Sequence, residues 1–174
     1  MADYHKMWEE LGMDVETHDQ LCEVLPQAFG DVYLSQENTP EGMDYYNFVV
    51  AEIHGVRPAE LIEHQKKGGK VFGTFCVYVP DEVVFAADAI ATGLCGGSQF
   101  WVPGGEKVLP TNTCPLIKAS VGARLDRTCP FFRIADMYVG ETTCDGKKKA
   151  WEILAEDVPV HVMDLPQMKR KKDV

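Results

Sequence analysis

The chain has 174 residues, 45% of them hydrophobic, and a formal net charge of −10 at pH 7. It is long enough to bury one hydrophobic core, whereas its acidic balance argues against nucleic acid as a partner, because phosphate binding needs a basic surface. Its longest apolar stretches are too short to span a bilayer. The N-terminal sequence MADYHKMWEE lacks a basic-then-apolar signal pattern, so we expect a cytoplasmic protein that binds no membrane.

The first 69 residues have helical patterns, and we expect them to form a helical appendage. Apolar residues recur close to helical spacing over residues 19–29. After a polar, turn-rich stretch, further helices are predicted at about 41–53 and 58–67, the latter stopped by Gly68 and its neighbouring glycine.

From Lys70 onward, short runs of strand-forming residues alternate with helical patterns. Strands are predicted in KVFGTFCVYV, at residues 91–95, in ADMYVGET and in PVHVMDL, and helices in VPDEVVFAADAIA, CPLIKASVGARL and CDGKKKAWEILAE. This alternation is typical of βαβ units. We therefore expect residues 70–174 to form a three-layer α/β fold with a four-stranded parallel sheet of the Rossmann or flavodoxin-like kind.

Six cysteines are more than packing requires in a cytosolic chain of this size. Their even number permits disulfides, but the lack of a secretion signal weakens that interpretation. No CxxC pair supports a zinc ribbon. We infer thiolates gathered from distant loops, the arrangement by which clusters and some catalytic sites are built.

Cys114 and Cys144 each stand at the start of a predicted helix. Cys114 is followed by Pro115, a preferred first-turn residue, and Cys144 follows the strand ADMYVGETT directly. The positive end of a helix dipole favours the thiolate that metals require, and open parallel sheets bind ligands beyond the carboxyl ends of their strands. We predict that both cysteines lie at one edge of the sheet, close to helix N-termini, and ligate a metal centre.

The other four cysteines allow more than one interpretation. Cys129 lies in a loop before a strand, where it could face the crevice or pack, and Cys95 lies in a glycine-rich loop that allows close approach. Cys76 in a strand is more typical of a small buried hydrophobe, although the strand end could point it at the site. Cys22 within a helix is assigned to core packing. The five histidines show no ligand spacing among themselves, and we assign them no role.

Polar residues on both sides of Cys144 are weaker candidates. Glu141, Thr142 and Thr143 could donate to or accept from a bound group, or could cap the strand end. Residues 147–149, all lysines, could stabilise an anion, although a solvated helix face is the plainer interpretation.

Three segments carry a family resemblance: TCPLIKAS, TCPFF and VGETTCDGKKKAWEIL. They resemble signature segments of the 2-hydroxyacyl-CoA dehydratase D-component family, which includes the dehydratases, the benzoyl-CoA reductase subunits and the double-cubane cluster proteins. FCVYVPDEVVFAADAIATGLCGG is similar to the opening βαβ unit of that family, and VHVMDLPQMK to its fourth strand. The continuous GETTCDGKKK match and the helical start MWEELGMDVETHDQ are closer to the double-cubane branch.

The resemblance implies a full-length protein with two similar α/β halves, both supplying cysteines to an iron–sulfur cluster of the [4Fe–4S] or double-cubane type. Cys114 and Cys144 match family ligand positions, and Cys95 and Cys129 resemble the additional ligands of the double-cubane branch. An ATP-hydrolysing iron–sulfur activator protein would supply low-potential electrons. Because the second half is missing after Val174, we expect this chain alone to be inactive and to hold no complete cluster.

Three functions follow from these expectations. The first is an ATP-coupled iron–sulfur reductase of a small molecule in anaerobic metabolism, and the second is a 2-hydroxyacyl-CoA dehydratase subunit. The third is a non-enzymatic electron-transfer or cluster-assembly module. We also expect a homodimer or heterodimer, because an uncovered crevice would leave an apolar patch lined by Cys95, Cys114, Cys129 and Cys144.

Overall fold

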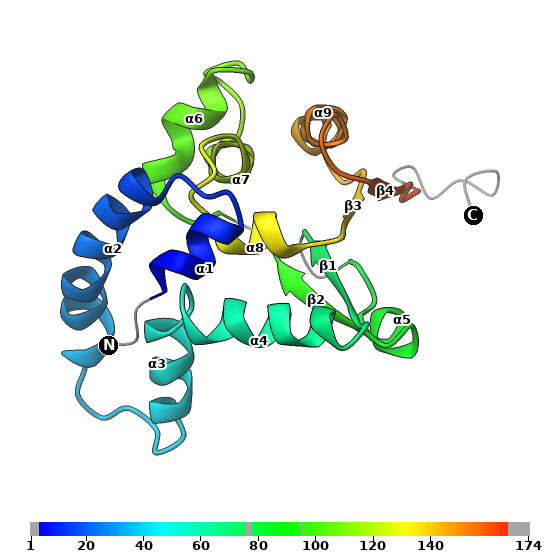
Figure 1. The fold of residues 1–174 in the computed structure, drawn as a ribbon. Helices are drawn as coiled ribbons and strands as arrows, with labels where there is room; N and C mark the ends of the chain where they lie inside the picture. The colour runs from blue at the N-terminus through cyan, green and yellow to red at the C-terminus, as the bar shows by residue number, and fades with distance from the viewer. Residues whose placement is uncertain (1–3, 76–77, 95, 167–174) are drawn as a thin grey trace.

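A computed structural model describes residues 4–75, 78–94 and 96–166 (Figure 1). The N-terminal region is helical, with α1 (His5–Glu10), α2 (Val15–Phe29), the π-helical turn η1 (Gly30–Leu34), α3 (Met43–Ala51) and α4 (Val56–Lys66). Strands and helices then follow in the order β1 (Lys70–Thr74), α5 (Asp81–Ala86), β2 (Ala89–Gly93), the 3-10 turn η2 (Gln99–Trp101), α6 (Val102–Glu106), α7 (Pro115–Leu125), α8 (Pro130–Ile134), β3 (Met137–Glu141), α9 (Asp145–Leu154) and β4 (Val160–Met163).

The four strands form one parallel sheet in the order β2-β1-β3-β4. The chain adds β2 on one side of β1 and then adds β3 and β4 on the other. This is the flavodoxin-like order, in which the direction of winding reverses between β1 and β3. The predicted α/β fold with a four-stranded parallel sheet is confirmed.

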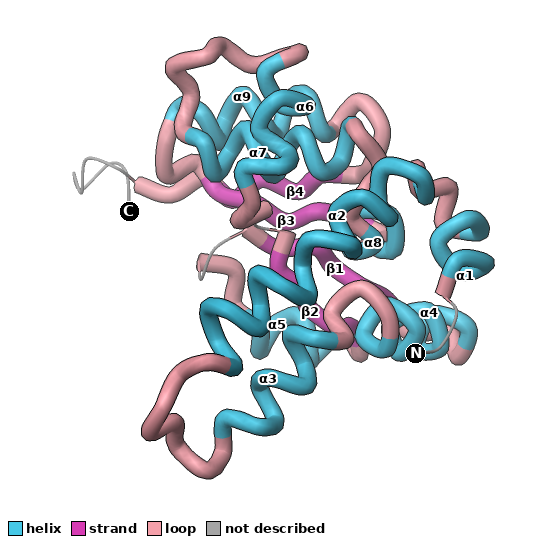
Figure 2. Tube along the Cα trace, turned by 90° about the vertical axis from the view of Figure 1, so that its left-hand side faces the viewer, coloured by secondary structure: helices cyan, strands magenta, loops and turns pink. Residues whose placement is uncertain are grey.

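Helices cover both faces of the sheet. Figures 1 and 2 show α6, α7 and α9 on one side of the strands and α4 and α5 on the other. Parallel strands need crossover connections, and these place α5 and α9 on opposite faces because the winding direction reverses. Within the described residues, no helix has both the length and the apolar character required to cross a membrane.

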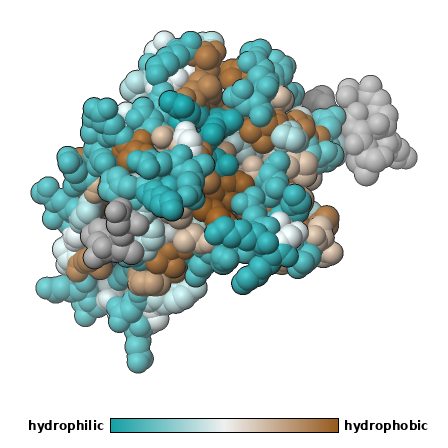
Figure 3. All heavy atoms as spheres, viewed as in Figure 1, coloured by the Kyte–Doolittle hydropathy of each residue, from teal (hydrophilic) through white to brown (hydrophobic). Residues whose placement is uncertain are grey.

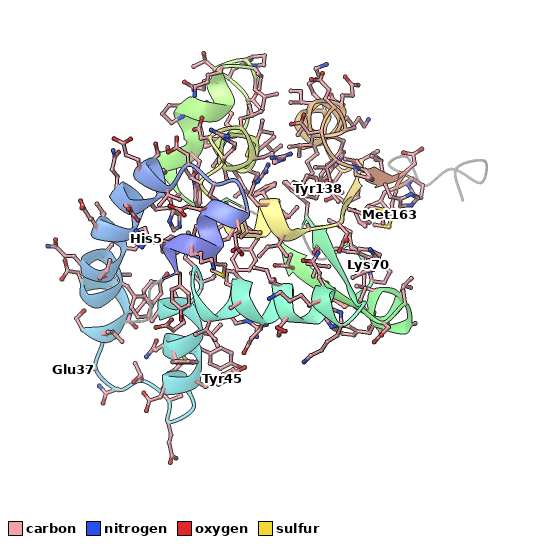
Figure 4. All side chains as sticks on the ribbon, viewed as in Figure 1. His5, Glu37, Tyr45, Lys70, Tyr138 and Met163 are labelled. Carbon is pink, nitrogen blue, oxygen red and sulfur yellow. The ribbon has the colours of Figure 1, made fainter. Side chains whose placement is uncertain are left out.

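The N-terminal helices and the sheet share one core. Leu21 of α2 and Leu61 of α4 belong to the same buried apolar cluster as Val71 of β1, Tyr138 of β3 and Trp151 of α9. Tyr138, labelled in Figure 4, is fully buried, and its hydroxyl donates to the Phe132 carbonyl at 2.6 Å. We propose that residues 1–69 form a helical appendage and residues 70–174 an α/β part, and that the two parts pack against each other around this shared core.

Apolar side chains also reach the surface. Figure 3 shows them in several separate places on one face of the molecule. Within α2, η1 and α3, the large exposed apolar residues are Val24, Leu25, Val32, Tyr33, Leu34, Tyr45, Tyr46, Phe48 and Val50.

The structure differs from the sequence-based expectation in its short helices. The segment RTCPFF was predicted as a loop, but Cys129 is the N-cap of α8 and Pro130 is its first residue. Proline is favoured in a first helical turn because its fixed φ suits the helix and its missing N–H would be unpaired there. Five residues are too few for a periodic apolar pattern, which explains why α6 and α8 were not predicted.

Candidate functional site

Cys144 begins the helix that follows β3. It is the N-cap of α9, has an extended backbone with φ −151° and ψ 162°, and is exposed. Its carbonyl accepts the first helical hydrogen bond, from the Lys148 N–H at 3.1 Å. The thiol therefore stands beyond the carboxyl end of β3, at the positive end of the α9 dipole.

The turn before Cys144 is held by Glu141, whose side chain is fully buried. One carboxylate oxygen accepts from the Thr143 N–H at 3.1 Å and from the Thr143 hydroxyl at 2.7 Å, and the other pairs with the Lys147 ammonium. Burial alone would raise the pKa of Glu141, but the hydrogen bonds from Lys147 and Thr143, with the Lys147 charge, hold it below its ordinary value. Glu141 therefore stays ionised and ties the strand end to the first turns of α9.

These contacts distinguish the interpretations left open for this segment. Glu141 caps the strand end, and Lys147 is its buried partner rather than part of a solvated helix face. Lys148 and Lys149 are exposed, as the plainer interpretation expected, and they pair with Asp145 and Glu152.

Cys114 begins α7 in the same way. It is the N-cap residue, with Pro115 as the first helical residue, and it is exposed. The preceding loop is tethered by the buried Lys118, whose ammonium donates to the Thr111 carbonyl at 2.7 Å and contacts Glu106 at 2.5 Å. A lysine near the start of α7 thus fixes the chain that leads to Cys114.

The starts of α7 and α9 lie close together. A Cβ at Gly146, in the first turn of α9, would lie 2.9 Å from Ile117 Cδ1, 3.6 Å from Thr113 Cγ2 and 4.0 Å from Cys144 Sγ. Thr113 directly precedes Cys114, and Gly146 follows Cys144 by two residues, so both cysteines lie next to this contact between the two helices. The lack of a side chain at Gly146 leaves room for it. Because α9 follows β3, this contact brings the start of α7 to the carboxyl edge of the sheet. The predicted placement of both cysteines at helix N-termini is confirmed.

Cys129 has a different environment. Although it is also an N-cap, it is buried in the main core cluster. Burial raises the pKa of its thiol to about 11, despite opposing hydrogen bonds from the backbone N–H groups of Phe132 and Phe131. The expectation that Cys129 lines an exposed patch is wrong, because the five-residue α8 packs Phe132 and Ile134, and Cys129 with them, into the core.

A pocket of about 500 Å³ lies next to Cys129. Its lining includes β2, the following Gly96, and His54 from the N-terminal region. Of the described residues, Cys114 and Cys144 do not line this pocket. The pocket and the two exposed thiols are therefore separate features. Cys76 and Cys95 lie outside the described residues.

Thiolates are the usual protein ligands of iron–sulfur clusters. Cys114 and Cys144 fit such a group, because they are exposed and each begins a helix of ten residues or more. Cys129 does not fit a cluster in this conformation, because its buried thiol favours the protonated form.

The buried roles of Lys118 and Lys147 were not predicted from the sequence. The only signal for them was a lysine close to apolar residues on a helix.

Two comparisons with known proteins found matches. A profile of the family described as 2-hydroxyglutaryl-CoA dehydratase, D-component, matches residues 76–174, which is more than half of the chain. A protein of Escherichia coli (strain K12) named "Putative dehydratase subunit YjiM" is 46% identical over 106 residues. The matched region covers 61% of this chain and 28% of that protein, so the match spans less than a third of this relative's length. The chain belongs to the 2-hydroxyglutaryl-CoA dehydratase D-component family.

Proposed function

We propose that this chain is the N-terminal part of an iron–sulfur enzyme of this family and that Cys114 and Cys144 are iron ligands. The observation that carries the proposal is the pair of exposed thiols at the adjacent N-termini of α7 and α9. When bound, the cluster would supply single electrons at low potential. Cys95 and Cys129 are proposed as further ligands, and Cys129 would first have to leave its buried position.

The residues around the two thiols have separate tasks in this proposal. The N-termini of α7 and α9 place the positive ends of two helix dipoles next to the two sulfurs. Glu141 and Lys147 hold the Cys144 turn as an internally neutralised pair, so they add no net charge next to the thiolates. Lys118 holds the loop that leads to Cys114.

Two reactions are supported by different observations. The matched family and the name of the Escherichia coli relative support a 2-hydroxyacyl-CoA dehydratase subunit. The GETTCDGKKK segment supports an ATP-coupled reductase of the double-cubane kind. In both cases we propose a separate ATP-hydrolysing activator as the electron donor, a dimeric assembly and a cytoplasmic location.

Iron and sulfide analysis of the full-length protein, purified without oxygen, tests the proposal. A dehydratase subunit should carry about four irons per chain and a double-cubane reductase about twice as many. The reduced protein is then mixed with its activator, ATP and a 2-hydroxyacyl-CoA ester. Formation of the enoyl-CoA product supports the dehydratase, and its absence together with the higher iron count supports the reductase. Protein that binds no iron even after anaerobic reconstitution would contradict both.

A further inference from the structure

A second group of metal-binding side chains lies in the N-terminal helices. His18 and Cys22 stand four residues apart on α2 and therefore share one face of that helix, and His54 follows α3. One potential ligand atom from each of the three residues lies within 4.8 Å of the other two. We propose that His18, Cys22 and His54 bind a Zn²⁺ ion, at a site separate from the iron ligands proposed above.

The three ligand atoms can reach one Zn²⁺ ion after small side-chain movements. Zn²⁺ binds imidazole nitrogen at about 2.0–2.1 Å and thiolate sulfur at about 2.3 Å, so two tetrahedral ligands lie roughly 3.3–3.6 Å apart. Cys22 Sγ is 3.6 Å from His18 Nε2 and 3.7 Å from His18 Nδ1, so the thiol lies beside the ring and must rotate about its Cα–Cβ bond to reach an ion bound at Nε2. His18 Nε2 and His54 Nδ1 are 2.6 Å apart and share a hydrogen bond, so the two rings must separate by less than about 1 Å to admit the ion.

The protonation states show what binding must change. Burial lowers the pKa of His18 and of His54 to about 4, so both imidazoles are neutral, the form that ligates metals. The proton they share moves to another ring nitrogen when the ion enters. Burial, with a smaller effect of Asp19, raises the pKa of Cys22 to about 11, so binding releases one proton from the thiol.

Neighbouring residues of α1 hold the rings in place. Trp8 packs edge-on against His18 with 4.3 Å between ring centroids, and its indole N–H donates to the His54 carbonyl at 2.8 Å. His5, the first residue of α1, pairs with Asp19, the neighbour of His18 on α2 (Figure 4). Rings oriented in this way lose little further freedom when they bind an ion.

The choice of Zn²⁺ follows from the donor set. Two imidazoles and one thiolate suit a borderline-soft ion, and three protein ligands with one open position are typical of zinc sites that also bind water or a small molecule. His54 lines the pocket of about 500 Å³, and a water or small molecule in that pocket would be the fourth ligand.

Titration of the reduced, chelator-treated chain with Co²⁺, a coloured substitute for Zn²⁺, tests the proposal. We expect one tight ion per chain, with sulfur-to-cobalt charge-transfer absorption and the strong visible bands of a tetrahedral site, and we expect Zn²⁺ to displace it. Cys22→Ser should abolish the charge-transfer band, and His54→Gln should weaken binding by more than about tenfold. His161→Gln, which changes an exposed histidine on β4, should have no effect.

The exposed thiols proposed as iron ligands are the main competitors for cobalt, and a Cys114→Ser/Cys144→Ser variant removes them. In that variant the cobalt spectrum should persist, and Cys22→Ser added to it should abolish the spectrum. If Cys22→Ser does not fold, His54→Gln in the same background replaces it as the test. Loss of all cobalt binding in the Cys114→Ser/Cys144→Ser variant, or a spectrum unchanged by both Cys22→Ser and His54→Gln, would overturn the proposal. Neither result bears on the iron–sulfur proposal, which is tested by iron content.

Discussion

Two helices of the β2–β3 connection, α7 and α8, show how differently one local motif can behave. At α7, a cysteine followed by proline starts an eleven-residue helix and its thiol is exposed. At α8, the same Cys-Pro pair starts a five-residue helix and its thiol is buried, with a pKa raised to about 11 by burial. A helix N-terminus is therefore not sufficient to make a cysteine available as a ligand. The packing of the helix that follows decides whether the sulfur reaches solvent.

Thiol alkylation should show the largest difference between the two regions. In the reduced native chain, iodoacetamide at neutral pH should modify Cys114 and Cys144 at least about 100-fold faster than Cys129, because alkylation needs an accessible thiolate. Peptide mass spectrometry after timed quenching measures each rate. In urea the three rates should converge. A native Cys129 that reacts as fast as Cys114 would show that α8 opens readily.

The buried pair that supports the Cys144 turn should have the next largest effect. Lys147→Met leaves the Glu141 carboxylate buried without its partner and should lower the free energy of unfolding by roughly 3–5 kcal/mol. Lys148→Met, one residue along the same helix but exposed, should change it by less than about 0.5 kcal/mol. Urea unfolding measures both variants. Equal stability of the two would mean that the pair is solvated in solution.

Two strand glycines provide a smaller, sterically defined comparison. A Cβ at Gly140 in β3 would lie 2.0 Å from Trp151 Cζ2, so Gly140→Ala must displace a core indole and should cost about 1–3 kcal/mol. A Cβ at Gly93, at the end of β2, meets no atom within 4 Å, and Gly93→Ala should be nearly neutral. Thermal unfolding ranks them, and a larger loss for Gly93→Ala would contradict the packing described for α9.

The smallest expected effect is a decrease in the free energy of unfolding at acidic pH. The pKa of Glu141 is held below its ordinary value of 4.5, so below that pH the unfolded state binds more protons than the folded state. The stabilisation is complete above about pH 4.5 and is lost as the pH falls through the lower, native value. Urea unfolding near pH 6 and near pH 4 should show this loss in the native chain and a smaller loss in Glu141→Gln.

The sequence predicted the fold where periodicity is strong. The alternation after Lys70 gave the order of strands and helices, and the strand–cysteine–helix order placed Cys144 correctly. It failed where the outcome depends on contacts between distant residues. The burial of Cys129 depends on how α8 packs, and the contact between His18 and His54 joins residues 36 positions apart.

One signal near His18 was nevertheless present in the sequence. Cys22 stands four residues after His18, which places both on one helix face. The five histidines show no ligand spacing among themselves and Cys22 was expected to pack, so the mixed pair was not predicted. The third member, His54, could be found only once α2 and α3 were placed in space.

The claim that Cys114 and Cys144 hold iron is tested most directly by the iron content of ligand variants of the full-length protein, prepared without oxygen. Cys144→Ser and Cys114→Ser should each lose most of the iron and sulfide, whereas Cys22→Ser, which lies away from α7 and α9, should retain the native content. Circular dichroism shows whether each variant keeps its helices. Folded Cys114→Ser and Cys144→Ser proteins with full iron, or an equal loss in Cys22→Ser, would contradict the assignment.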